Sequence, residues 1–266
     1  MPTIACVTAE LEKIAPLRLA ADWDSVGLLV GSSSKRATID RVMTCLSLTA
    51  AVAHEAICDK VDLILTHHPL PFRPLSRITA ETASGRVLLE LISAGIAVWS
   101  SHTAWDSAAG GINDQLAALL PLEQVAPIEP DSLNAAVGFG RAGEALPDCS
   151  VGDVARLIAQ QLGVLGVMVA GDQRRPAGRI GIVCGSGGES VAAAARVGCT
   201  TFLTGEIKLH GCLEALASGL AVIAVGHHAS ERFSLPVLAE RLSLALPALS
   251  CWASRSETDP LVWVAS

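Results

Sequence analysis

The sequence has no tyrosine, and aromatic residues make up only 3% of its 266 positions. It also lacks any run rich in lysine and arginine, and its net charge is −7. Because surfaces that bind nucleic acid or anionic membranes need clustered positive charge, we expect neither as a partner. No apolar stretch approaches the roughly 20 residues needed to cross a bilayer.

None of the eight cysteines forms a C-x-x-C pair, and most of them lie in apolar runs. Such cysteines are typical of small core residues in a reducing compartment. The first residues do not form a basic-then-apolar signal sequence, because Glu10, Glu12 and Lys13 interrupt them early. We therefore expect a cytoplasmic protein.

Hydrophobic residues make up 51% of the chain, enough for the core of one large domain or two smaller ones. Predicted strands alternate with predicted helices, which indicates an α/β fold with largely parallel sheets. The expected strands span 41–48, 63–68, 96–99, 134–142, 165–170, 179–184, 201–204, 220–225 and 261–264. The expected helices span 8–20, 49–59, 85–94, 113–120, 151–162, 189–197, 210–218 and 235–246.

The second half of the sequence resembles the first. The predicted strand 201–204 aligns with 63–66 without a gap, so Gly205-Glu206 lies opposite His67-His68. The alternative is that two βαβ runs look alike by chance. We favour an internal duplication that gives two similar βαβ-built domains.

A segment rich in proline and acidic residues, 121–131, marks a plausible boundary between these domains. We predict a first, metal-binding domain from residues 1–128 plus 225–266. The second domain then covers residues 129–224. A metal site is expected at the C-terminal ends of the strands, in the cleft.

Two adjacent histidines, His67 and His68, end the predicted strand that begins at Leu63. Adjacent residues of a strand point to opposite faces, so both imidazoles reach one site only if the chain turns there. Pro69 and Pro71 favour such a turn. The alternative interpretation is a pair of surface histidines in a loop.

Two further histidines follow predicted strands and share a spacing. Asp106 comes four residues after His102, and Glu231 comes four residues after His227. A helix would place each pair on one face. Histidines and carboxylates at the C-terminal ends of separate strands are typical of a metal site in an open α/β sheet.

These segments together resemble the Nif-three-like family, whose members are commonly labelled GTP cyclohydrolase I type 2 homologues. The matching motifs are Trp23 to Leu28, Thr66 to Pro69, His102 to Asp106, Gly110 to Asp114, Thr204 to Glu206 and Gly226 to Glu231. They occur in family order over most of the chain. Two positions depart from the family: Ser25 replaces the usual asparagine, and His228 stands where an aromatic residue is common.

The resemblance implies a homohexamer with two divalent metal ions per subunit and a small-molecule substrate such as a nucleotide. The metal ligands that it implies are His67, His68, Asp106, His227 and Glu231. Whether His227 or the neighbouring His228 binds stays open at this point. His102 is not a ligand in the resemblance, and we interpret it as a proton shuttle, a residue that orients a ligand, or a structural histidine.

Three imidazoles and two carboxylates suit Zn, Fe, Mn, Co or Ni, and do not suit Ca or Mg alone. Two such ions acidify a water towards neutrality, so water can open a purine imidazole ring or hydrolyse an ester or amide. No cysteine lies near a ligand motif in the sequence, Cys212 being the nearest to a candidate histidine, His210. We therefore expect no serine or cysteine side chain to attack the substrate.

Other features leave alternatives open. The glycine-rich segment 184–188 indicates a tight strand–helix turn more strongly than a phosphate-binding loop. Glu206, Lys208 and His210 have no assigned role, although Glu206 is a candidate for a helix cap or, with Asp22 and Asp24, for contact with a base. Two functions fit the sequence: a metal-dependent hydrolase, and a non-catalytic metal-binding or regulatory scaffold.

Overall fold

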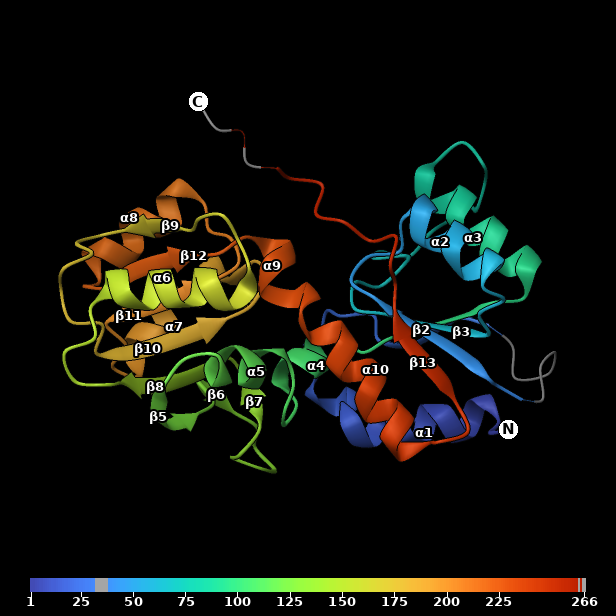
Figure 1. Ribbon diagram of the computed structural model, residues 1–266, viewed down its shortest axis with the longest axis horizontal. Helices are drawn as coiled ribbons and strands as arrows, with labels where there is room; N and C mark the ends of the chain where they lie inside the picture. Colours follow the sequence, from blue (N-terminus) through green and yellow to red (C-terminus); the bar gives the residue numbers. More distant parts are fainter. Residues whose placement is uncertain (32–37, 263, 265–266) are drawn as a thin grey trace. The chain divides into compact units, whose positions relative to one another are not determined.

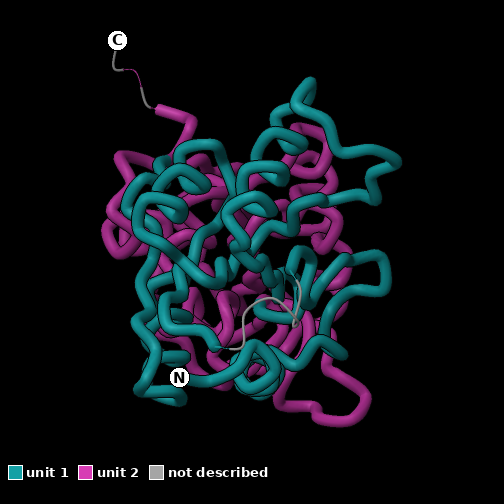
Figure 2. The backbone as a smooth tube through the Cα atoms, turned by 90° about the vertical axis from the view of Figure 1, so that its right-hand side faces the viewer, with its two compact units in different colours: residues 1–105, 234–258 teal, residues 106–233, 259–266 magenta. Residues whose placement is uncertain are grey.

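The protein, described by a computed structural model over residues 1–31, 38–262 and 264, divides into two compact α/β units. Unit 1 comprises Met1–Trp105 and Ser234–Thr258, and unit 2 comprises Asp106–Phe233 and Asp259–Ser266 (Figure 2). Unit 1 is thus built from two separate stretches of chain. The sequence analysis placed domain boundaries at 128/129 and 224/225. Those boundaries describe domains related by duplication, and they stay a prediction.

The sheet of unit 1 has the strand order β1-β4-β3-β2-β13. Neighbouring strands are parallel except β1, which is antiparallel to β4. The strands are β1 (Gly27–Val30), β2 (Arg41–Cys45), β3 (Leu63–Thr66), β4 (Ala97–Ser100) and β13 (Ser250–Ala253). The helices are α1 (Ile4–Ile14), η1 (Leu17–Leu19), α2 (Ala50–Cys58), α3 (Ala83–Ala94) and α10 (Ser234–Ala245), and α4 (His102–Ser107) leads from unit 1 into unit 2.

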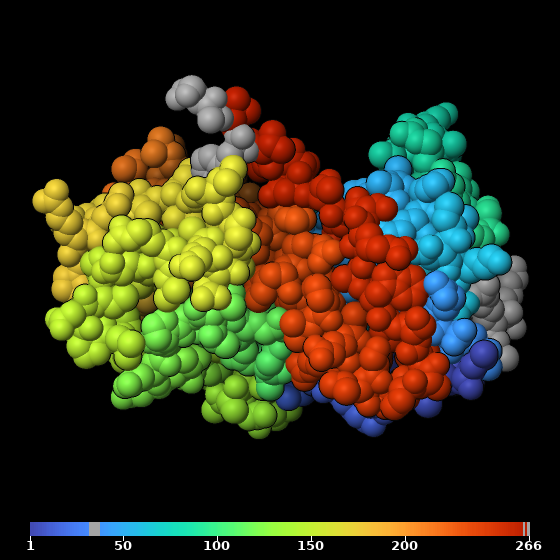
Figure 3. Space-filling view, viewed as in Figure 1, coloured from blue at the N-terminus to red at the C-terminus, as the bar shows by residue number. Residues whose placement is uncertain are grey.

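Helices cover both faces of this sheet, which explains why every residue of β3 and β4 is buried. On one face α2 and α3 lie side by side, and their side chains form a core with the strand residues Met43, Ile64 and Val98 (Figure 1). On the other face α10 packs on β2 and β13 and contacts α1. The orange-red surface of α10 faces the viewer in the space-filling view (Figure 3).

Two expectations for unit 1 are wrong. The first helix spans Ile4–Ile14, not 8–20, because the Thr3 side chain caps it by accepting from Cys6 N (3.3 Å) and Pro16 follows its end. The strand expected at 261–264 is not observed at residues 261, 262 and 264, and Trp263 lies outside the described residues. The C-terminal strand of unit 1 is β13, which pairs with β2 at the edge of the sheet.

The sheet of unit 2 has the order β5-β8-β10-β11-β12-β9, in which β10, β11 and β12 are parallel. The remaining pairs, β5–β8, β8–β10 and β12–β9, are antiparallel. These strands are β5 (Leu122–Ala126), β8 (Arg141–Ala145), β9 (Met168–Ala170), β10 (Arg179–Val183), β11 (Thr201–Thr204) and β12 (Ala221–Ala224), beside a separate pair, β6 (Glu129–Pro130) and β7 (Gly138–Phe139). The helices are α5 (Ile112–Ala118), α6 (Val151–Leu162), η2 (Gly187–Ser190), α7 (Val191–Arg196), α8 (Leu209–Ala217) and α9 (His227–Arg232).

The core of unit 2 gathers around Phe202 of β11, with Ala194 of α7 and Ala215 of α8 packed against it. Helix α6 spans the residues expected from the sequence, because Ser150 and Asp153 form a capping box at its start. Each unit thus contains three neighbouring parallel strands in sequence order, β2-β3-β4 and β10-β11-β12. The duplication itself stays a prediction. No helix in the described part of the chain is long and apolar enough to cross a membrane.

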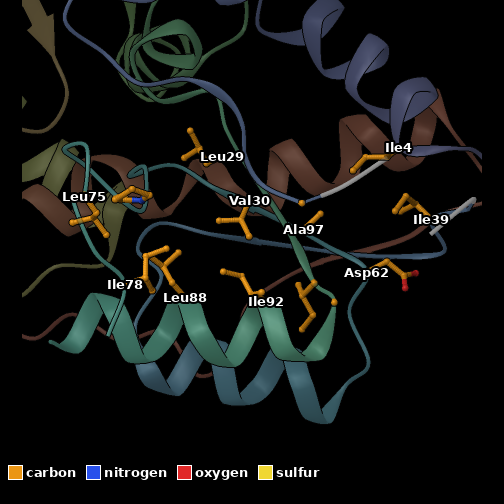
Figure 4. Close-up of a pocket in the computed structure, with 14 residues that line it drawn as sticks. Ile4, Leu29, Val30, Ile39, Asp62, Leu75, Ile78, Leu88, Ile92 and Ala97 are labelled. Carbon is orange, nitrogen blue, oxygen red and sulfur yellow. The ribbon is translucent and has the colours of Figure 1, made fainter. Parts of the chain in front are cut away.

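Unit 1 also contains an apolar pocket of about 510 Å³. Leu88 and Ile92 of α3 line it together with Val30 of β1 (Figure 4). Among the described residues that line it, Asp62 is the one with a titratable side chain, and its carboxylate accepts from the backbone N–H groups of Asp40 (2.8 Å) and Arg41 (3.0 Å). The histidines singled out in the sequence lie elsewhere, so this pocket is not the candidate site for chemistry.

A buried carboxylate attaches the C-terminal part of unit 1 to α2. Glu55 is 7% exposed. It accepts hydrogen bonds from Ser254 Oγ (2.7 Å), Arg255 N (3.0 Å) and Ser256 N (2.9 Å). Burial raises the pKa of Glu55, but these hydrogen bonds outweigh burial and lower the pKa from 4.5 to about 2.

We expect Glu55→Gln to destabilise the protein at pH 7 by about 1.5–3 kcal/mol, the typical value for hydrogen bonds to a charged group. Since the folded pKa is the lower one, ionised Glu55 stabilises the fold above pH 4.5, and this contribution is lost as the pH falls towards about 2. Urea unfolding at several pH values should show the difference between wild type and variant shrinking over that window. The exposed Glu240→Gln serves as the control, and a difference that is independent of pH would contradict the assignment.

Candidate metal centre

Three histidines of unit 1 gather at the C-terminal ends of two neighbouring parallel strands. His67 and His68 follow β3, and His102 opens α4 just after β4. Because Thr66 pairs with Ser100 at the ends of these strands, the residues that follow start side by side. One imidazole nitrogen from each histidine lies within 4.8 Å of those of the other two. The chain turns as the sequence analysis required, so the rings of His67 and His68 are 5.1 Å apart.

Neighbouring polar groups fix the orientation of two of these rings. Nδ1 of His68 lies 2.7 Å from Ser47 Oγ, and Nδ1 of His102 lies 2.8 Å from Asp24 Oδ1. With Nδ1 of His102 engaged by a carboxylate, its Nε2 is the nitrogen for a metal or a proton. His102 is therefore placed at ligand spacing from His67 and His68, which the sequence alone did not indicate.

Asp24 lies at the candidate centre in a position that the sequence analysis did not assign to it. Its carboxylate is fully shielded from solvent. Burial raises the pKa of Asp24, but hydrogen bonds from His102 and Thr103 outweigh it and lower the pKa overall. A carboxylate committed to His102 and Thr103 is an orienting group, and not the contact to a base that we considered. The sequence feature that could have identified Asp24 is its position in the Trp23 to Leu28 motif, which matches the family.

In unit 2, an imidazole and a carboxylate meet on the short helix α9. His227 is the first residue of α9, and its Nε2 lies 3.1 Å from Oε2 of the buried Glu231, one turn later. Its Nδ1 lies 3.1 Å from Oε1 of Glu206. The hydrogen bond to Glu231 raises the pKa of His227 to about 9; burial opposes this shift, and Glu206 adds to it. Two carboxylates on one imidazole make this a place that stabilises positive charge.

Gly185 makes room for this pair. A Cβ at residue 185 would lie 2.1 Å from Glu231 Oε1 and 3.2 Å from His227 Nε2, and its φ of +58° favours glycine. Backbone N–H groups of the same turn donate within the protein, Gly185 N to Ser230 Oγ (2.9 Å) and Gly187 N to Thr204 Oγ1 (3.0 Å). These bonds agree with a tight strand–helix turn and not with a phosphate-binding loop.

Asp106 lies beside Cys184, a residue at the end of β10. Burial raises the pKa of the Cys184 thiol well above its usual value, and the charges of Asp106 and Glu231 and a hydrogen bond with Asp106 raise it further. Both carboxylates therefore lie close to this one thiol. No cysteine is near a candidate ligand along the sequence, but the loop after β10 brings Cys184 close to Asp106 and Glu231 in space. The same charges keep the thiol protonated, so Cys184 is a poor nucleophile.

The remaining candidates differ in their relation to these groups. Nδ1 of His228 is 3.9 Å from Asp259 Oδ2, whereas the adjacent His227 contacts both glutamates. Glu206 contacts Ser186 and His227 and does not cap α8, whose N-cap is Lys208. His210 is exposed on α8. The repeat had placed Glu206 opposite His67-His68, which is the signal that could have assigned it to the site.

The donor set fits a divalent metal. Neutral imidazoles and carboxylates are the ligands of Zn, Fe, Mn, Co and Ni. Unit 1 supplies three imidazoles at mutual ligand spacing, and unit 2 supplies an imidazole–carboxylate pair for which Gly185 leaves the space. The structure thus contains candidate metal-binding clusters of histidine and glutamate at residues that the sequence singled out.

The chain matches known proteins over almost its whole length. A relative from Clostridium perfringens named GTP cyclohydrolase 1 type 2 homolog is 33% identical and covers 96% of this chain and 97% of its own. NIF3-like protein 1 of Drosophila melanogaster is 32% identical over 99% of this chain and 90% of its own. The crystal structure of a Bacillus cereus protein related to NIF3 has the same fold, with a TM-score of 0.91, 21% identity and 99% of each chain covered. A sequence model of the Duf34/NIF3 (NGG1p interacting factor 3) family matches residues 2–260, and the chain belongs to this family.

Proposed function

We propose that this protein binds two divalent metal ions per chain and is a metal-dependent hydrolase that acts on a purine nucleotide. The ligands in this proposal are His67, His68, Asp106, His227 and Glu231. The observation that carries it is the group of three histidines at the ends of β3 and β4. The name of the Clostridium perfringens relative, a GTP cyclohydrolase homolog, supports the choice of a nucleotide.

The chain's own residues then have distinct tasks. Metal ions of this kind, when bound, supply Lewis acidity and lower the pKa of water. His102 accepts and returns protons through Nε2, because the buried Asp24 holds Nδ1 (2.8 Å) and orients the ring. Glu206 holds His227 at 3.1 Å and fixes the direction of its ring. Water opens the purine imidazole ring or cleaves an ester or amide, with no enzyme side chain as nucleophile.

Turnover by purified protein tests the catalytic part of this proposal. The metal-free protein and the protein reconstituted with Zn, Mn, Fe, Co or Ni are incubated with GTP, and the products are separated chromatographically. We expect hydrolysis only after reconstitution. Full metal loading without turnover of any purine nucleotide would instead favour the non-catalytic metal-binding scaffold.

We expect His227→Ala to lower the metal content and His228→Ala to leave it at two ions per chain. The reason is that His227 contacts Glu231 at 3.1 Å, whereas His228 lies 3.9 Å from Asp259 and outside both clusters. Elemental analysis of protein purified without chelator and supplied with metal measures this. One ion or fewer in the wild-type protein would contradict the proposed stoichiometry.

We further propose that the protein assembles as a homohexamer, as the family resemblance implies, and that it does so in the cytoplasm, as the cysteine usage indicates. A mean hydropathy of +0.48 is high for a chain whose described helices are too short or too polar to cross a membrane, and it suits burial between copies. Leu133 and Leu165 are 80% and 86% exposed in the single chain. Sedimentation at micromolar concentration is expected to give six chains per particle, and a stable monomer would contradict this.

A further inference from the structure

Two aromatic side chains of unit 1 are exposed although the chain has few aromatic residues. Trp23 is 66% exposed and Phe72 is 52% exposed. No other tryptophan or phenylalanine in the described part of the chain is exposed to this degree. Rings of this size contribute most to stability when they are buried, so two of them left in water at one place indicate a binding surface.

These two rings lie beside the three histidines. Trp23 comes from the loop before β1, and Phe72 comes from the loop after His68. Their centroids are 6.3 Å apart, and each meets the His102 ring edge to face, at 6.0 Å for Trp23 and 6.1 Å for Phe72. Two separate loops therefore bring their aromatic rings to one histidine of the candidate centre.

The loop that carries Trp23 is bound to the start of α4 by residues before and after Trp23 in the sequence. Ala21 N donates to Thr103 Oγ1 at 3.0 Å, and the Asp24 carboxylate accepts from Thr103 N at 3.1 Å. Asp24 also holds His102 at 2.8 Å. The contacts that orient the imidazole thus also place the indole, so Trp23 is held in position before any ligand arrives.

We propose that Trp23 and Phe72 form an aromatic rim that stacks the planar base of a purine nucleotide beside His67, His68 and His102. This inference rests on the proposed function and names its recognition element. Aromatic rings stack on every base and so need no hydrogen-bond code, which agrees with the absence of an N-K-x-D-like segment from the sequence. The exposed Arg73 follows Phe72 and gives the same loop a positive charge that suits the phosphates.

Calorimetric titration of the full-length, metal-loaded protein tests the rim without relying on turnover. The ligands are GTP and inorganic tripolyphosphate, which carries the phosphates but no ring. Trp23→Ala and Phe72→Ala are each expected to raise the Kd for GTP about ten- to hundredfold, the effect typical of losing one stacked ring. The Kd for tripolyphosphate and the metal content should stay at the wild-type values, and Trp23→Phe should retain most of the affinity for GTP.

The outcomes separate this inference from the proposed hydrolase. GTP binding that depends on the two rings but leads to no turnover supports the rim and contradicts the hydrolase. Metal-dependent turnover with wild-type KM in the Trp23→Ala/Phe72→Ala double variant supports the hydrolase and overturns the rim. An unchanged Kd for GTP, an equal loss for GTP and tripolyphosphate, or no GTP binding by the wild type also overturns it. A change in sedimentation with unchanged Kd would assign the rings to an interface between copies.

Discussion

Replacing Glu231 by glutamine is expected to remove at least one of the two metal ions and to abolish any hydrolysis. The carboxylate is 4% exposed and lies 3.1 Å from His227 Nε2, so the substitution removes a buried negative charge that a cation would share. Glutamine has nearly the same shape and keeps one oxygen, so the packing against Gly185 is retained. We expect metal affinity to fall by more than the roughly 10- to 100-fold that loss of an orienting group costs.

Elemental analysis and GTP turnover, measured on the same preparations, test this result. Asp106→Asn should behave like Glu231→Gln, because both carboxylates act on the Cys184 thiol and so lie close to one place. Glu214→Gln, an exposed change on α8, is the matched control and should leave both readouts at wild type. Cys212→Ala should also leave turnover close to wild type. Activity that survives exhaustive removal of metal but is lost on alkylation of thiols would refute the mechanism.

Arg141→Ala is expected to destabilise the fold by about 3 kcal/mol, the lower end of the usual cost of breaking a buried ion pair, because the Asp114 side chain is 29% exposed. Arg141 is 1% exposed at the start of β8, and its guanidinium binds both carboxylate oxygens of Asp114 on α5. The same group donates to the backbone carbonyls of Gly138 (2.8 Å), Gly140 (2.6 Å) and Ala108 (3.3 Å). In the variant, three backbone carbonyls and the Asp114 carboxylate therefore lose the guanidinium group that binds them.

Urea unfolding followed by circular dichroism measures this loss. Arg156→Ala provides the comparison, because Arg156 forms an exposed ion pair with Asp153 at 2.7 Å. Exposed pairs of this kind contribute little to stability, because water screens the charges. Unfolding midpoints of Arg141→Ala and Arg156→Ala that shift equally would show that the buried network does not stabilise unit 2.

The sequence predicted those features that follow from local chemistry. The apolar runs before His67, His102 and His227 end where strands end, because a parallel strand covered on both faces must be apolar throughout. The spacing of four between His227 and Glu231 was sufficient to place both on one face of α9. The helix expected at 151–162 is observed as α6, and its start is fixed locally by the Ser150 and Asp153 side chains, which form a capping box.

Features that depend on distant parts of the chain could not be predicted in this way. Asp24 meets His102 over 78 positions, and only the pairing of β1 with β4 brings the two segments together. Cys184 comes close to Asp106 for a similar reason, through the loop after β10. The apolar run at 261–264 has the composition of a strand, but composition does not tell that β13 already holds the edge.

The pairing of β13 with β2 has a consequence for synthesis on the ribosome. Ser250 pairs with Arg41, so the sheet of unit 1 stays incomplete until almost the whole chain has been made. All the described strands of unit 2 lie before residue 225 and emerge before β13. Until then β2 has an open edge of backbone N–H and C=O groups, and such edges pair with other chains. A nascent or prematurely terminated chain that ends before residue 250 is thus an aggregation hazard along Arg41–Cys45, while its second half already has the strands it needs to fold.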